Sequence, residues 1–278
     1  MKRLLLGLLI FNVLINHYSF GQKMPIDYFD EGINYNNAKD YKKAIESFKY
    51  IVRNYPKDPL YPRAFYNVGY ISLIDKQYDS AIFYFKAILV SNFNEKEALG
   101  GDIMADPYTN YRHHASELIS DIYYNKEMYD SSLYYFSLSD TLYPYMHFCG
   151  NEYAENDVHK AIMYSEIYEK LKNKDKAIEA LLQAVFIRLA NNSKVITHLK
   201  TLLADKKKLK KELDNALVNI YLKTIQGKNG SYTQYYFKFQ NAEIEVPDSY
   251  EKENKSFDKS KAIKSIHETA FYKMICKL

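Results

Sequence analysis

The sequence predicts an all-α fold, in which helical hairpins repeat along the chain and stack into a solenoid. Residues 25–56 place small and aromatic side chains at spacings that suit two packed helices. A related pattern returns three more times, so that units start near residues 25, 62, 113 and 158. The chain has 278 residues, 47% of them hydrophobic, and is therefore long enough to bury a sizeable core.

The first unit carries the pattern most completely. Gly32 and Ala44 are small residues, one on each predicted helix, and we expect the helices to cross closely there. Asp40 is expected to cap the second helix, and Pro56 is expected to end it. Aromatic residues should fill the space around the crossing: Tyr28, Tyr35 and Phe48.

These spacings resemble those of the tetratricopeptide repeat (TPR) family, whose unit is a helix–turn–helix of about 34 residues. The resemblance in the first unit rests on Tyr28, Gly32, Tyr35, Ala44, Phe48 and Pro56. It implies a TPR-like solenoid of four to five helix pairs. It also implies a non-enzymatic scaffold for protein–protein interaction, and it implies no chemical reaction.

The later units keep part of the pattern. The second unit retains Gly69 at the helix crossing, whereas the third and fourth have Ser120 and Ser165 there. We therefore expect the helices of these two units to stand slightly further apart. Two predicted insertions, at 92–112 and 139–157, interrupt the stack. Such insertions either form loops or helices on a binding face, or merely pad the stack.

A fifth helical pair is expected to complete the repeat domain, which we place at residues 22–226. Asn192 or Ser193 can cap a helix that runs to about Leu203. Apolar residues then recur at helical spacing from Leu209 until Gly227.

Residues 227–278 are predicted to form a cap of a different kind. Residues 232–239 and 244–246 alternate in the manner of a small β-hairpin, and residues 258–278 suit one final helix. A hairpin and a helix together could cover the apolar end of the array, which repeat proteins require.

Residues 1–21 are predicted to be a signal peptide. Lys2 and Arg3 precede an apolar run, and small residues follow at the expected cleavage site. We therefore expect a protein of the periplasm or cell envelope, or a secreted one, with no stable membrane span in the mature chain. An uncleaved anchor is the alternative. Cys149 and Cys276 remain after processing, and the sequence leaves open whether they pair.

Charge and motifs argue against several other functions. The net charge of +4 is too small to indicate a nucleic-acid partner. No phosphate-binding loop or nucleophile elbow is present in the sequence. His113 and Glu117 share a helical face beside His114, but no third metal ligand is evident, so we predict no metal and no cofactor. An exported hydrolase or metalloenzyme and a specific neutraliser of a secreted protein are the alternative functions.

The family resemblance also implies where a partner binds. The concave groove of a TPR array is lined by one face of the first helix in each unit. Carried onto this sequence, that face comprises Phe29, Ile33, Asn36, Arg63, Tyr66, Tyr70, Glu117, Asp121, Tyr124, Glu166 and Glu169. These residues are aromatic at first and acidic later, so we expect a protein segment that mixes apolar and basic residues. The alternative is that the chain's own insertions fill the groove.

Overall fold

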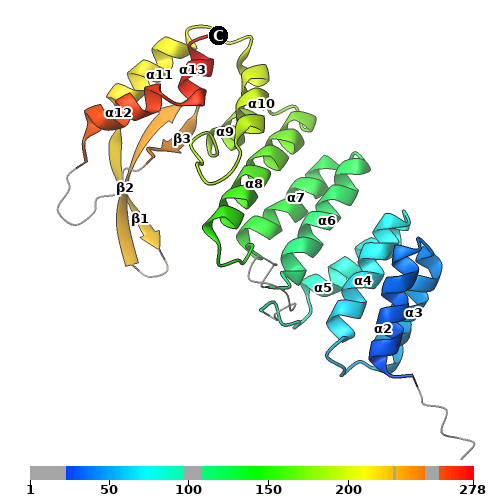
Figure 1. Ribbon diagram of the computed structural model, residues 1–278. Helices are drawn as coiled ribbons and strands as arrows, with labels where there is room; N and C mark the ends of the chain where they lie inside the picture. Colours follow the sequence, from blue (N-terminus) through cyan, green and yellow to red (C-terminus); the bar gives the residue numbers. More distant parts are fainter. Residues whose placement is uncertain (1–22, 97–107, 228–229, 248–256) are drawn as a thin grey trace, which may run out of the picture. The chain divides into compact units, whose positions relative to one another are not determined.

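The computed structural model describes residues 23–96, 108–227, 230–247 and 257–278, and these residues are mostly helical (Figure 1). They divide into two compact units, the first ending at Phe93 and the second running from Asn94 to Leu278. The boundary therefore falls inside the predicted repeat domain. The predicted signal peptide and most of the first predicted insertion lie outside the described residues.

The first unit consists of two helical hairpins, as predicted. Its helices are α2 (Pro25–Asn37), α3 (Tyr41–Asn54), α4 (Tyr61–Ile74) and α5 (Tyr78–Leu89). Asp40 caps α3, because its carboxylate accepts a hydrogen bond from the backbone N–H of Lys43 at 3.3 Å. The helix ends at Asn54, just before Pro56.

The helices of both hairpins approach closely at a glycine. A Cβ atom built on Gly32 would lie 2.6 Å from the ring of Phe48, and one on Gly69 would lie 3.0 Å from the ring of Phe85. Both rings are completely buried. The predicted need for a small residue at Gly32 is therefore confirmed, and the group that requires it is the Phe48 ring.

The second unit continues with helical pairs. They are α6 (Tyr111–Asn125), α7 (Tyr129–Thr141), α8 (Gly150–Lys170), α9 (Lys174–Leu182), α10 (Ser193–Leu203) and α11 (Leu209–Val218). Within the predicted insertion at 139–157, the structure has the end of α7, a connecting loop and the first turns of α8. The α8 helix thus begins well before Val158, where the fourth unit was predicted to start.

Serine replaces glycine at the helix crossings of the second unit, with two different results. The Ser120 hydroxyl donates a hydrogen bond to the carbonyl oxygen of Ser132 at 2.9 Å and lies 3.0 Å from the Ser132 hydroxyl. Ser165 is also completely buried, but its hydroxyl has no hydrogen-bond partner among the described residues. The crossing between α6 and α7 is therefore hydrogen-bonded, and the one between α8 and α9 is not.

A three-stranded antiparallel sheet follows α11, in the order β1 (Tyr221–Gly227), β2 (Gly230–Phe239) and β3 (Ala242–Glu245). The predicted hairpin corresponds to β2 and β3 and is confirmed. The prediction that a helix continues until Gly227 is wrong, because α11 ends at Val218 and β1 pairs along its length with β2. Leu222 and Ile225 have a spacing that fits a helix, and pairing with the adjacent strand β2 overrides it.

The predicted final helix is interrupted. It forms α12 (Lys259–His267) and α13 (Ala270–Ile275), because the Thr269 side chain caps α13 by accepting a hydrogen bond from the backbone N–H of Tyr272 at 3.2 Å. Phe237 of the sheet and Phe271 of α13 belong to the same buried cluster as Leu181 and Leu199 of the helical pairs. The C-terminal region therefore shares its core with the repeats that precede it.

Candidate functional site

In the first unit, the predicted groove residues lie on α2 and α4. The rings of Tyr66 and Tyr70 stack with centroids 6.2 Å apart, and Tyr66 also contacts the buried Phe85. Tyr70 is 41% exposed and Ile33 is 38% exposed. Phe29 is half-buried and packs edge-on against the ring of Phe48, so it serves the core as well as the surface. Asn36 and Arg63 are half-buried.

In the second unit, the predicted groove residues come from α6 and α8. Glu117 and Asp121 lie one turn apart on α6, and Glu166 lies on α8. The pKa of Asp121 is raised from 3.8 to about 6, mainly by burial and in addition by the nearby negative charges of Glu117 and Glu166. The structure thus brings together three of the predicted acidic residues. Tyr124, further along α6, packs against Tyr129.

These carboxylates differ in how they are neutralised. Asp121 and Glu166 form no ion pair or hydrogen bond with any residue that the structure describes. Glu169, by contrast, pairs with His198 of α10. Lys160 of α8 forms ion pairs with Asp140 at 3.0 Å and with Asp157 at 2.8 Å.

Glu166 also lines a hollow between α8 and α10. The hollow has a volume of about 330 Å³ and is bordered by Ser193, Lys194, Thr197 and His198 of α10. Lys194 reaches this hollow without forming an ion pair with Glu166 among the described contacts. Sequence reasoning placed Glu166 in the groove, but it did not anticipate that α10 forms the opposite wall.

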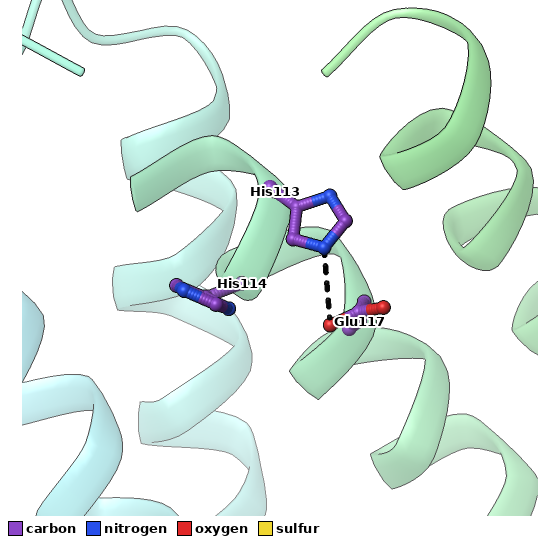
Figure 2. A group of neighbouring side chains, drawn as sticks. All are labelled: His113, His114 and Glu117. Carbon is purple, nitrogen blue, oxygen red and sulfur yellow. Dashed lines mark ion pairs between the residues drawn. The ribbon is translucent and has the colours of Figure 1, made fainter. Parts of the chain in front are cut away.

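A second group of polar side chains lies at the start of α6 (Figure 2). His113 is only 3% exposed, and its Nε2 atom lies 3.4 Å from a Glu117 carboxylate oxygen. Burial lowers the pKa of His113 and raises the pKa of Glu117. His114 is the third member, since one ligand atom from each residue lies within 4.8 Å of the others. The sequence placed His114 beside the pair but did not indicate that it could act as a third ligand.

Two further observations bear on the predicted cellular setting. No helix among the described residues is long and apolar enough to cross a membrane. Cys149 and Cys276 are free thiols in the structure, the first half-buried and the second exposed.

Comparison with known proteins identifies repeats in both compact units. Residues 28–58 and residues 161–190 each match a model described as a tetratricopeptide repeat. No curated protein matches the chain in sequence. One solved structure, from a functional characterization of Pseudomonas aeruginosa pilF, is similar at 15% identity and a TM-score of 0.41, covering 66% of this chain and 67% of that one. With a matched repeat and helical pairs in each unit, the chain contains tetratricopeptide repeats, and such repeats support a scaffold for protein interaction.

Proposed function

We propose that the surface formed by α6 and α8 binds a basic side chain of a partner protein. The observation that carries the proposal is that Asp121 and Glu166 lack a cationic partner in the described structure while repelling one another. A lysine or arginine placed between them would relieve this repulsion and neutralise the negative charge that the fold leaves uncompensated. A hydrogen bond between charged groups at a half-buried site contributes about 1.5–3 kcal/mol.

The first unit supplies surfaces suited to apolar contact. Tyr66 and Tyr70 present stacked rings, and aromatic side chains give a large contact area at a small cost in conformational entropy. The partner is therefore a protein that offers both apolar and basic residues. The acidic surface is proposed from contacts within the second unit, and the aromatic surface is proposed from contacts within the first unit.

We also propose that the protein acts after export, in the cell envelope or outside the cell. The support is the sequence of residues 1–21, with its basic start and apolar run. N-terminal sequencing of the native protein should find a chain that begins at or near Gln22. Recovery of chains with intact Met1 from the cytoplasm would contradict the proposal.

A peptide selection tests the acidic surface and requires no identified partner. Random peptides displayed on phage are selected against the wild type, and the selected pool is then measured against the double variant Asp121→Asn with Glu166→Gln. We expect selected peptides to contain lysine or arginine and to lose at least about tenfold in affinity, which corresponds to 1.4 kcal/mol.

The control removes the same number of charges from the second helices of two pairs. Asp130→Asn with Glu179→Gln changes exposed residues of α7 and α9 and should leave affinity unchanged. Selected peptides that lack basic residues, or that bind both double variants equally, would contradict the proposal. The variant Glu166→Lys should slow association and flatten its dependence on salt.

The aromatic surface has its own test. Tyr66→Ala with Tyr70→Ala should weaken binding of a partner by well over tenfold, because a stacked pair of aromatic side chains is lost. Circular dichroism must show intact helices, since Tyr66 also contacts Phe85. Unchanged affinity in a folded variant would show that the partner makes its apolar contact with another surface.

A further inference from the structure

The buried ring of His113 is held in one orientation by the backbone. Its Nδ1 atom lies 3.1 Å from the carbonyl oxygen of Ser139 and 3.0 Å from that of Tyr143. Carbonyl oxygens can only accept hydrogen bonds, so Nδ1 carries a proton. Because the ring is 3% exposed, burial favours its neutral form, which has a lone pair at Nε2.

That lone pair faces another acceptor. The Nε2 atom is directed at a Glu117 carboxylate oxygen, Oε2, at 3.4 Å (Figure 2). The other oxygen, Oε1, is buried without a hydrogen-bond partner among the described residues, and it lies 3.6 Å from His159 Nε2 of α8. Two acceptors that face one another require a shared proton or a cation between them.

His114 supplies the third ligand that a metal ion would need in addition to His113 and Glu117. We propose that His113, His114 and Glu117 form a three-ligand site for a divalent transition-metal ion, with Zn²⁺ as the ion that suits two imidazoles and one carboxylate. The Ser139 and Tyr143 carbonyls fix the ring of His113 from behind, as outer partners of metal-bound histidines do. His159 can hydrogen-bond to the distal oxygen of Glu117 in the same manner.

The site must contract to bind the ion. The three ligand atoms lie within 4.8 Å of one another, whereas ligands around tetrahedral zinc are about 3.4 Å apart. His113 is fixed by the backbone, so the adjustment falls to His114 and Glu117, whose side chains are less deeply buried. Three protein ligands leave the fourth position of a tetrahedral ion open to water or to a partner's side chain.

A bound cation would alter the acidic surface described above without abolishing it. It would neutralise Glu117 and leave Asp121 and Glu166 as the carboxylates available to a basic partner. The metal site and the partner surface can therefore be tested separately, because zinc binding requires no partner.

The test is a zinc titration of the full chain, without an affinity tag, after removal of metal with a chelator. We expect the wild type to bind one equivalent of Zn²⁺, and its melting temperature to rise with zinc concentration. His114→Ala and Glu117→Gln should each weaken binding by at least about tenfold, and His159→Gln by about tenfold. Co²⁺ in place of Zn²⁺ should give a visible spectrum typical of tetrahedral coordination in the wild type alone.

His198→Ala is the matched control, because His198 pairs with Glu169 in a site with two ligands only among the described residues. It should bind zinc as the wild type does. His114 is half-buried, and loss of its ring should leave the fold intact, which the melting temperature without metal will show. Failure of the wild type to bind one equivalent, or equal binding by folded His114→Ala, would overturn the proposal and assign any bound zinc to scattered surface histidines.

Discussion

The two compact units form the same helix crossing with different side chains. In the first unit, Gly32 and Gly69 let the buried rings of Phe48 and Phe85 lie against the helix backbone. In the second unit, Ser120 forms a hydrogen bond across the crossing, and Ser165 remains buried without a partner among the described residues. One repeat geometry can thus be held by apolar packing alone or by packing combined with polar groups.

A similar contrast is found on the first helix of the helical pairs in the two units. The first unit presents stacked tyrosines, whereas the second unit keeps carboxylates and histidines half-buried or buried on α6. Buried ionisable groups destabilise a fold unless they are compensated. The first unit is therefore packed mainly through apolar and aromatic contacts, and the second carries ionisable groups that other described residues leave without a hydrogen bond or ion pair, such as Asp121.

Replacing Gly32 by leucine should cause the largest change in stability. The leucine side chain must enter space that the Phe48 ring occupies, so we expect the free energy of unfolding to fall by about 1–3 kcal/mol or more. Lys42→Leu, on the exposed side of α3, should cost less than about 0.5 kcal/mol. Chemical denaturation measures both, and similar small losses would show that the crossing is not tightly packed.

Alanine at the two glycines gives a finer comparison within the first unit. The new Cβ atom would lie 2.6 Å from Phe48 at Gly32, but 3.0 Å from Phe85 at Gly69. Alanine also favours a helix by about 1 kcal/mol over glycine, which can offset the milder contact. We therefore expect Gly32→Ala to be clearly more destabilising than Gly69→Ala, and the reverse order would contradict the packing described.

Asp121→Asn should stabilise the protein at neutral pH. Its folded-state pKa of about 6 lies above the ordinary value of 3.8, so the ionised carboxylate costs stability above pH 6. We expect a gain on the order of 1–3 kcal/mol near neutral pH, which shrinks as the pH falls from about 6 to about 4 and the wild type becomes protonated.

Denaturation in the presence of a chelator checks the effect, so that metal bound nearby does not contribute. The control is Asp30→Asn, an exposed aspartate of α2, which should change stability by less than about 0.5 kcal/mol at either pH. A loss of stability in Asp121→Asn would mean that a cation within the chain already compensates this carboxylate.

The two buried serines should respond to alanine with opposite signs. Ser120→Ala removes the hydrogen bond to Ser132 and should cost about 0.5–1.5 kcal/mol. Ser165→Ala removes a buried hydroxyl that has no partner in the described structure, so it should be neutral or stabilising by about 1 kcal/mol. Equal losses at both positions would indicate that an ordered water bonds to the Ser165 hydroxyl.

The repeated helical pairs could be predicted from the sequence because their determinants are local. Residues three and four apart share a helical face, so the apolar face of each helix follows from spacing, and the resemblance to the tetratricopeptide repeat placed Gly32 and Ala44 at the close crossing. Helix caps are local as well, and Asp40 was correctly predicted for that reason. The cap of α13 at Thr269 has the same local signal, but the apolar stripe across residues 258–278 concealed it.

The tertiary structure decided the features that depend on contacts between elements. Strand β1 forms because the next strand, β2, pairs with it, and the apolar spacing alone did not distinguish β1 from the helix that precedes it. The pKa of Asp121 depends on its burial and on the charges of Glu117 and of Glu166, which lies on another helix, and the orientation of His113 depends on the carbonyls of Ser139 and Tyr143. The sequence therefore determined the helices and the residues on their faces, while the contacts between elements decided which of those residues lie together, since electrostatic and hydrogen-bond energies depend on distances between atoms far apart in the chain.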